Sequence, residues 1–591
     1  MKKSLHIALC VIMVIAMLAG CAPTATTTPI PSEVPEPTTE PVPEQTAFKA
    51  GTYEASARGM NGPVPVTVTV TEDAIESVVV GENTETLGLG DIAAEKLPAR
   101  IVEAQSLAVD TVSGATITSY AILSAVEDAL GQAEADIAAL KVKAPEKELV
   151  KGDTETVDVV IVGAGLSGIM AAYDLKIKNP DTSYILLEQL DVIMGSLPMA
   201  GGAIIADKSK LHTENGMESS IDDIIKILEF ASAGPVNNEY IKNIYANAEE
   251  LLNRLIDWGA PLGNPTLSKE PASDKVYAFW ADGRGAGFAH FFNEQVKKDA
   301  INLRLNSKAT ELIVTDGVVT GVKVEDKEKT YEIHAKAVLL ATGGFGMNQE
   351  LIKKYSPYYV GGISRTTAGA TGDGFLMTEQ FNPEIVGNGM MGGGPRASLA
   401  VGSIASMFAV STEGTRFANE SDNLAIVDGM GGTLTAYRLM DANFPDQDTL
   451  QAHIDAGLIA PFDTLEALAK EYGINESNLL ATVKAYNEAV DAGTSPGFDL
   501  PVEKAQKLEK APFYAEKINL SWFGTIPGIK VDNQMRILDG NGVPVPGLYA
   551  TGELTEGNFY TRTYPGAGVG ISYATYTGPY AVRNIIEDLN K

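Results

Sequence analysis

Cysteine is almost absent from this chain, which has two cysteines, Cys10 and Cys21, among its 591 residues. Both lie near the N-terminus, so the rest of the chain contains none. That region therefore has no disulfide, no cysteine-ligated iron–sulfur cluster and no C-x-x-C-H haem attachment site. The absence excludes disulfide-stabilised scaffolds and these two kinds of cysteine-bound redox group.

Positive charge, histidine and long hydrophobic runs are also scarce. The chain has 45 Lys and Arg against 76 Asp and Glu, which gives a formal net charge of −31 and a pI ≈ 4.6. Such a polyanion repels a phosphate backbone, which argues against a nucleic-acid partner. Beyond the N-terminus no segment reaches the roughly 20 apolar residues of a transmembrane helix. The five histidines are His6, His212, His290, His334 and His453.

The N-terminus carries a secretion signal. Lys2 and Lys3 precede an apolar run over residues 5–17, and Leu-Ala-Gly then precedes Cys21. A charged start, an apolar centre and small residues at the end are typical of a signal peptide. The last four residues resemble the lipobox of bacterial lipoproteins, which implies that residues 1–20 are removed and that Cys21 is lipidated. A plain signal peptide or a membrane anchor is the alternative.

Residues 21–47 are rich in Pro, Thr and Glu, a composition that cannot bury a core. We interpret them as an extended tether. Together with the lipobox resemblance, the tether predicts an extracytoplasmic protein, lipid-anchored to the outer face of the bacterial cell membrane.

Residues 48–135 read as a small α+β domain. Alternating patterns predict strands over 51–57, 64–70 and 75–80, and a helix follows over 119–129. Between them, residues 110–119 read Asp-Thr-Val-Ser-Gly-Ala-Thr-Ile-Thr-Ser. By propensity alone this is a polar turn in which Ser113 or Thr116 caps the helix.

The same turn resembles the Asp-x-x-Ser-Gly-Ala-Thr element of FMN-binding domains, such as the small subunits of sodium-pumping quinone reductases. The resemblance implies that a flavin transferase attaches FMN covalently, through its phosphate, to Thr116. Ser113, Gly114 and Ala115 complete the implied FMN site, and a helix N-terminus suits the phosphate.

After a Lys- and Glu-rich linker, residues 136–156, the chain reads strand, glycine turn and helix. The β-branched strand 157–162 runs into Gly163-x-Gly165-x-x-Gly168, and residues 169–178 have helical character. The spacing is typical of a tight turn that holds a dinucleotide diphosphate on a helix N-terminus. A second strand over 184–187 ends at Glu188, the acid expected to bind ribose hydroxyls. The predicted nucleotide-binding residues are Gly163, Ala164, Gly165, Ser167, Gly168 and Glu188.

Further glycine motifs follow in order: Gly195 to Gly202, Thr342 to Gly346, Gly372-Asp373-Gly374 and Gly552-Glu553. From about residue 158 onward the chain resembles the flavoprotein subunits of fumarate reductases and succinate dehydrogenases, and more closely the soluble flavocytochrome-type members. The resemblance implies non-covalent FAD, although Gly195 stands where the family has Asn. It adds to the FAD site Ser196, Ala200, Gly201, Gly202, Asp373, Glu553, Gly570 and Ile571.

The expected fold class is α/β: a Rossmann-type FAD-binding domain over 157–385 and 523–591, with an α+β capping domain inserted at 386–522. The small FMN-binding domain precedes it. Family members pass a hydride from flavin to an activated C=C bond while a protein group protonates the other carbon.

This chain departs from the family where a dicarboxylate would bind. No histidine lies in the relevant motifs, Leu424 replaces the proton-delivering arginine, and Phe523-Gly524 stands in place of His-His. Arg416 belongs to a family motif and is expected to be structural. Met390 and Met391 are candidates for an apolar pocket, although methionine more often fills a core. A clamp for a four-carbon dicarboxylate is therefore doubtful.

Residues 558–570 contain candidates for the substrate-binding and proton-donating residues that the other motifs lack. Their Tyr-Pro-Gly-x-Gly portion resembles ketosteroid dehydrogenases, in which a tyrosine hydroxyl and a glycine N–H hold a substrate oxygen, and this implies Tyr564 and Gly568. Arg562 lies near the family's carboxylate-binding arginine, with a salt bridge as the alternative. Tyr560 and Arg562 are the candidate proton donors.

We therefore predict a flavin-dependent reductase of an α,β-unsaturated carboxylate or enone, of the fumarate, urocanate or acrylate type, in anaerobic respiration. A membrane donor, either a quinol or a flavin-based chain, supplies electrons through FMN to FAD. No metal is expected. The alternatives are a ketosteroid-type dehydrogenase working in the oxidative direction and a non-catalytic electron carrier.

Overall fold

The structure is a computed structural model. It describes residues 48–86, 89–112, 114–143, 148–267, 275–396, 408–432, 434–445, 447–455 and 457–591. The predicted signal, Cys21, the tether and Ser113 lie outside the described residues. Within the described ranges, no helix combines the length and apolar character needed to span a membrane.

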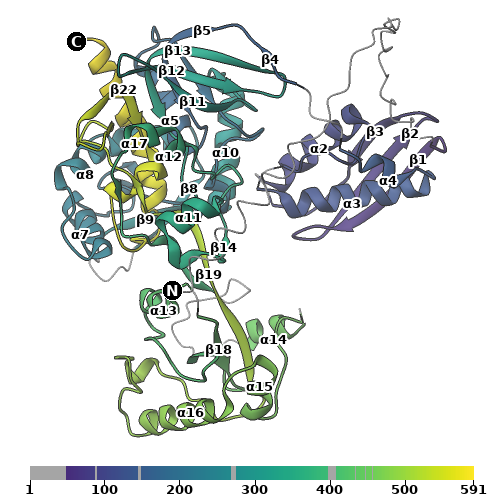
Figure 1. The fold of residues 1–591 in the computed structure, drawn as a ribbon, viewed down its shortest axis with the longest axis vertical. Coiled ribbons are helices and arrows are strands. Elements are labelled where there is room, and N and C mark those ends of the chain that lie inside the picture. The colour runs from purple at the N-terminus through teal and green to yellow at the C-terminus, as the bar shows by residue number, and fades with distance from the viewer. Residues whose placement is uncertain are drawn as a thin grey trace, which may run out of the picture. The chain divides into compact units, whose positions relative to one another are not determined.

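The small domain packs helices on an antiparallel sheet (Figure 1). Strand β1 (Gly51–Arg58) pairs with β2 (Pro63–Val70), which pairs with β3 (Ile75–Val80). Alternate residues of β2 are buried valines, as expected of a strand with one covered face. The three predicted strands and the predicted helix are confirmed. The helices are α2 (Gly90–Ala104), α3 (Thr116–Gln132) and α4 (Ile137–Leu140).

The large domain is built on a mixed sheet in the order β10-β6-β5-β13-β12-β11. Its centre is parallel, because β13 (Lys329–Leu340) pairs in parallel with both β5 (Glu155–Val162) and β22 (Pro544–Ala550). Three strands that are close in space thus end at one edge of the sheet, although β22 lies more than 200 residues further along the chain. The remaining strands are β6 (Tyr184–Leu187), β10 (Leu303–Arg304), β11 (Lys308–Thr315), β12 (Val318–Glu325) and β21 (Arg536–Leu538).

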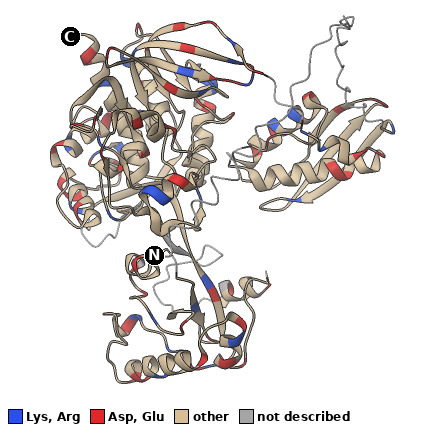
Figure 2. Cartoon of the chain, viewed as in Figure 1, with Lys and Arg blue, Asp and Glu red and all other residues tan. Residues whose placement is uncertain are grey.

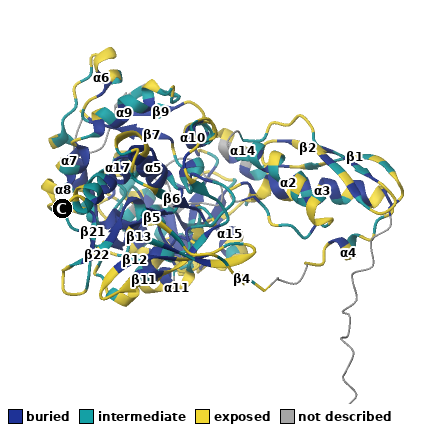
Figure 3. Cartoon of the chain, turned by 90° about the horizontal axis from the view of Figure 1, so that it is seen from above, coloured by how far each residue is buried: buried dark blue, intermediate teal, exposed yellow. Residues whose placement is uncertain are grey.

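Helices α5 (Leu166–Lys178) and α17 (Val569–Leu589) lie side by side next to this sheet (Figure 1). The buried Asp174 of α5 accepts hydrogen bonds from Arg583 Nε at 2.7 Å and from Arg254 Nη1 at 3.0 Å. These charge-assisted bonds compensate the burial of the carboxylate and fix α5, whose first turn forms the glycine motif. Figure 3 shows buried residues concentrated along β5, β6, β13, α5 and α17.

Smaller elements complete the large domain. Strands β7 (Ala203–Ile205), β8 (Leu262–Leu267) and β9 (Tyr277–Ala281) form an antiparallel sheet. The helices are α6 (Lys210–Glu214), α7 (Ile221–Ser232), α8 (Asn238–Tyr245), α9 (Ala248–Asp257), α10 (Arg284–Asp299), α11 (Gln349–Tyr355) and α12 (Asp373–Thr378). The 3₁₀-helices are η1 (Leu197–Met199), η2 (Pro357–Tyr359), η3 (Glu379–Phe381) and η5 (Gly552–Asn558).

The predicted linker, residues 136–156, contains structure of its own. It includes α4, and its strand β4 (Val150–Lys151) pairs in parallel with β13 of the large sheet. Strand β5 also begins two residues before the predicted Val157. Short, polar strands of this kind lack the apolar pattern that a strand prediction needs.

The inserted domain has its own sheet and core. The long strand β19 (Tyr514–Thr525) runs through it and pairs with β14 (Ile363–Ser364), β16 (Met391–Arg396) and β18 (Ala436–Met440). Because β19 continues to Thr525, the predicted boundary at residue 522 falls inside a strand. The other elements are β15 (Ile385–Val386), β17 (Phe408–Ser411), β20 (Gly528–Ile529), α13 (Asn423–Met430), α14 (Gln447–Asp455), α15 (Leu465–Tyr472), α16 (Glu476–Asp491) and η4 (Val502–Lys504).

Over the described chain as a whole, acidic and basic residues are interspersed along the ribbon (Figure 2).

Candidate functional site

A cavity of about 1400 Å³, counted together with the space that is open to solvent, lies at the carboxyl ends of β5, β13 and β22. Segments far apart in sequence line it: the β5–α5 turn, the Glu188 loop, the turn after β13, η5 and the start of α17. The cavity thus gathers the predicted glycine motifs of the large domain around one space.

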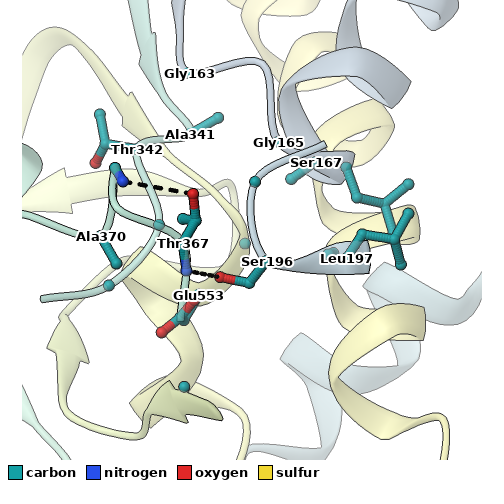
Figure 4. Close-up of a pocket in the computed structure, with 18 of the residues that line it drawn as sticks. Gly163, Gly165, Ser167, Ser196, Leu197, Ala341, Thr342, Thr367, Ala370 and Glu553 are labelled. Atoms are coloured by element: carbon teal, nitrogen blue, oxygen red, sulfur yellow. Dashed lines mark hydrogen bonds between the residues drawn. The ribbon is translucent and has the colours of Figure 1, made fainter. Parts of the chain in front are cut away.

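The three glycines of the first motif differ in what surrounds them. Gly163 has φ +103°, and a Cβ there would lie 2.4 Å from the carbonyl oxygen of Ala341. A Cβ at Gly168 would lie 2.0 Å from the carbonyl oxygen of Gly163. A Cβ at Gly165 would meet no protein atom within 4 Å, and Gly165 lines the cavity (Figure 4). Two of these glycines thus permit the turn, and the third leaves space for a ligand.

Helix α5 presents its N-terminus at this point. Gly165 is its N-cap, and no side chain caps its free N–H groups. An uncapped N-terminus of a 13-residue helix attracts an anion through these groups and the helix dipole. Ser167, in the first turn, lines the cavity and shares a 2.8 Å hydrogen bond with Thr551.

Glu188 follows β6, as the sequence predicts, and lines the cavity although it is buried. Its Oε2 accepts a hydrogen bond from the N–H of Ala164 at 2.9 Å, and its Oε1 accepts one from the N–H of Leu190 at 2.9 Å. Burial raises the pKa of this carboxyl, which the backbone N–H groups partly oppose. The carboxylate is thus held at the cavity wall by backbone, where a ribose would lie.

The Gly195 to Gly202 segment divides into two parts. Ser196 and Ala200 line the cavity, and Ser196 Oγ accepts a 3.2 Å hydrogen bond from the N–H of Thr367 (Figure 4). Gly201 and Gly202 do not line it. A Cβ at Gly202 would lie 2.2 Å from the backbone of Arg284, so this glycine serves the packing of α10.

Asp373 lines the cavity at the start of α12. It accepts a 2.6 Å hydrogen bond from Thr371 Oγ1, and Lys308 Nζ lies 3.0 Å from its Oδ1. Lys308 also lines the cavity, and no sequence motif indicated it. Its sequence signal was weak, because Lys308 is the first residue of an ordinary strand, β11, and becomes part of the site only through the sheet order.

Glu553 and Thr342 face the same space from the segments that follow β22 and β13 (Figure 4). Glu553 Oε1 accepts hydrogen bonds from the N–H and the hydroxyl of Thr525, at 2.7 and 3.1 Å. Burial raises the pKa of the Glu553 carboxyl. The hydroxyl oxygen of Thr342 is buried and has no hydrogen-bond partner, which is unusual for a polar atom and suits a site that binds a polar group.

Near η5 and the start of α17, the cavity is also lined by side chains that can hold protons. Tyr560 donates a 2.5 Å hydrogen bond from its hydroxyl to Glu556 Oε1, and both side chains are buried. Tyr564 is half-buried, packs edge-on against Phe523 and accepts a 3.1 Å hydrogen bond from the N–H of Gly570. Gly570 and Ile571 line the cavity here as well.

Two predicted substrate residues lie elsewhere. Arg562 is exposed and does not line the cavity. Gly568 is buried at the N-cap of α17, and it is the N–H of Gly570 that reaches the Tyr564 hydroxyl. Glu556 was missed by the sequence analysis. The sequence signal for Glu556 was its spacing: it lies three residues after Glu553 and four before Tyr560, which would bring the three side chains close together in helical turns.

Three residues of the inserted domain also lie outside the lining. Met390 and Met391 are buried in the main core. Arg416 is buried and donates from Nε to Glu420 at 2.7 Å and from Nη1 to the carbonyl of Pro496 at 2.6 Å. Its guanidinium also lies over the ring of Tyr486. Arg416 is therefore a structural residue of this domain.

In the small domain, Thr116 is the first residue of α3 and is exposed. Ala115 occupies the N-cap position, and no side chain caps the helix, so Thr116 is not the cap that propensity allowed. Gly114 is exposed with φ +80°. The hydroxyl of Thr116 is thus accessible at the open N-terminus of a 17-residue helix, which suits a phosphate group.

Comparison with known families decides what this fold is. Residues 158–571, more than half of the chain, match the family described as FAD binding domain. The chain belongs to that family. Residues 59–131 match the FMN-binding domain family, so the chain carries both domains. FAD fits the cavity, since the turn at Gly165 is open, the helix N-terminus is uncapped and the hydroxyl of Thr342 is unpartnered.

Relatives of known activity match most of this chain. NADH:acrylate oxidoreductase of Vibrio harveyi is 30% identical over 86% of this chain, which spans 59% of that protein's length. Urocanate reductase of Eggerthella lenta is 27% identical over 85% of this chain and 87% of its own. The open conformation of a flavocytochrome c3 fumarate reductase has the same fold, with a TM-score of 0.62, 23% identity and coverage of 76% of this chain and 84% of its own.

Proposed function

We propose that this protein reduces the C=C bond of a small α,β-unsaturated carbonyl compound. One observation carries the proposal: the cavity that the glycine motifs line is also lined by Glu556, Tyr560, Tyr564 and Phe523. Bound FAD supplies the hydride. The chain supplies what FAD lacks, namely hydroxyl and carboxyl groups that deliver a proton.

The lining favours an enone or a monocarboxylate over a dicarboxylate. Lys308 is the single basic side chain among the described residues of the lining, and it pairs with Asp373. Two further carboxyl groups, Glu553 and Glu556, line the same cavity. A substrate with two carboxylates would meet these acids without a cationic partner, and burying an unpaired charge is costly.

Tyr564 is suited to hold the substrate oxygen. Its hydroxyl already accepts a hydrogen bond from Gly570, and Phe523 packs edge-on against its ring. A fixed hydroxyl in a half-buried site orients a carbonyl without rearranging in the reaction. Phe523 supplies an apolar wall against which a conjugated substrate can stack.

Electrons reach FAD, in this proposal, from FMN bonded to Thr116 and originally from a membrane donor, a quinol or a flavin-based chain. The exposed Thr116 hydroxyl supports this arrangement, since a flavin transferase needs access to it. Cys21 would anchor the protein outside the cell by its lipid, and residues 21–47 would be the tether. Replacing Cys21 with alanine should release the protein from membranes. Retention of the variant in the membrane fraction would contradict the anchor.

The test of the activity is a screen on the dithionite-reduced holoenzyme, in which flavin reoxidation is followed with acrylate, urocanate, fumarate and simple enones. We expect rapid reoxidation by monocarboxylates or enones and slower reoxidation by fumarate. Failure of every activated alkene to reoxidise the flavin would contradict the proposal.

A second candidate is oxidation in the reverse direction, as in ketosteroid dehydrogenases. The contact between the Tyr564 hydroxyl and a glycine N–H favours it, although the glycine is Gly570 rather than the predicted Gly568. Assays in both directions, with a reduced dye and with an oxidised acceptor, separate the two candidates.

A further inference from the structure

Glu556 has no part in any motif, yet it lies where the proposed reaction needs a proton. It is buried on η5, and its Oε1 accepts the 2.5 Å hydrogen bond from Tyr560. A Cβ built at Gly570 would lie 3.3 Å from both Glu556 Oε1 and the Tyr564 hydroxyl oxygen, so these oxygens converge on one part of the cavity wall.

We propose that Glu556 is the proton store of this site and supplies, through the hydroxyl of Tyr560, the proton that the substrate carbon receives. The inference rests on the proposed function, which leaves the source of the proton unassigned. Glu556 is the store, Tyr560 is the donor, and Tyr564 holds the substrate oxygen.

The transfer balances within these groups. Hydride addition to one alkene carbon leaves an electron pair on the other carbon, next to the carbonyl. That carbon takes the Tyr560 hydroxyl proton, so a C–H bond forms and the Tyr560 O–H bond breaks. The protonated Glu556 carboxyl gives its proton to the Tyr560 oxygen in the same step. The products are a saturated substrate, an intact Tyr560 hydroxyl and a Glu556 carboxylate, and the observed donation from Tyr560 to Glu556 is the arrangement that results.

The surroundings allow Glu556 to regain its proton near neutral pH. Burial, together with the nearby Glu553 carboxyl, raises the pKa of Glu556 to about 8, which the Tyr560 hydrogen bond partly opposes. The other titratable groups that face the pair are Tyr564 and Tyr573. Burial raises the pKa of the Tyr560 hydroxyl well above its usual value. A tyrosinate therefore does not accumulate, which is why the donor needs a carboxyl behind it.

The test compares Glu556→Gln and Tyr560→Phe with the wild-type holoenzyme. Glutamine accepts the same hydrogen bond but holds no transferable proton, so we expect substrate-driven flavin reoxidation to slow by about 10²–10⁴-fold. Reoxidation by ferricyanide needs no proton transfer to carbon and should stay unchanged. Tyr576→Phe is the matched control and should leave both rates unchanged, because Tyr576 is equally buried, donates to the carbonyl of Ile205 at 2.8 Å and does not line the cavity.

An infrared titration supplies a readout that does not depend on activity. A protonated-carboxyl band should disappear with a midpoint near pH 8 in the wild type, be missing in Glu556→Gln and shift to higher pH in Tyr560→Phe, which lacks the opposing hydrogen bond. Wild-type rates in Glu556→Gln, or a band that titrates near the ordinary glutamate pKa, would overturn the inference and leave the proposed function intact. If no alkene reoxidises the wild-type flavin, the proposed function fails, and the infrared titration still decides whether Glu556 stores a proton.

Discussion

The two flavin sites of this chain differ in how they would retain their cofactor. The FAD site is a cavity whose walls come from segments hundreds of residues apart, and its shape is set by backbone positions at which side chains would clash. The proposed FMN site is one exposed hydroxyl, Thr116, at the start of a helix. A cavity retains its ligand through many contacts, whereas an exposed site needs a covalent bond to keep one. The comparison predicts that the two flavins can be removed separately.

The largest effect is expected for Thr116→Ala. Removal of the hydroxyl should reduce covalent flavin from one per chain to none, because no bond to the phosphate can form, while FAD content stays normal. Flavin fluorescence of the denatured protein, expressed together with a flavin transferase, measures the change. Thr116→Ser keeps a hydroxyl and is the matched control. Covalent flavin that survives in the alanine variant would place the attachment elsewhere.

The reciprocal change is Gly163→Val. Its Cβ would lie 2.4 Å from a backbone carbonyl at φ +103°, a conformation that β-branched residues avoid. We expect the large domain to lose about 3 kcal/mol or more of unfolding free energy and to bind no FAD. Denaturant unfolding and the ratio of FAD to protein measure both effects. Covalent FMN should remain, and its loss in this variant would show that the sites are not independent.

The sequence alone predicted the FAD cradle well because its residues follow one another along the chain. The strand at 157–162, the glycines after it and Glu188 behind the next strand are a local pattern, and the structure places them together. Lys308 and Glu556 escaped prediction for the opposite reason. Each lies in a segment without a motif and reaches the cavity only through the pairing of distant strands and the packing of η5 on α17.

Helix α2 and strand β4 were missed for a related reason. The helix contains Pro98, which normally argues against a helix interior, and only its spaced buried residues Ala93, Leu97 and Ile101 indicate it. Arg562 shows the complementary difference between sequence and structure, because it is exposed and does not line the cavity. Its position near a family arginine suggested a role, but the loop before α17 turns its side chain toward solvent.

A smaller effect is expected for Gly165→Ala, which separates folding from binding. The φ of Gly165 is −67° and its Cβ would meet no protein atom, so the unfolding free energy should change by less than about 0.5 kcal/mol. The methyl group would occupy the space that the FAD diphosphate approaches. We expect the Kd for FAD to rise about tenfold, which corresponds to about 1.4 kcal/mol. Unchanged affinity in FAD titrations of the apoprotein would show that the diphosphate lies elsewhere.

The smallest effect is expected for Gly114→Ala, the equivalent change at the FMN site. Gly114 has φ +80°, and its Cβ would lie 3.0 Å from the end of the Leu89 side chain, which can move. Left-handed backbone costs an alanine about 1 kcal/mol, so flavin attachment should slow by about fivefold while the final occupancy stays complete. A time course of covalent flavin formation measures this. If Gly114→Ala abolished attachment, the shape of the loop before Thr116 would be needed for FMN binding. The FMN site would then depend on backbone shape, as the FAD cavity does.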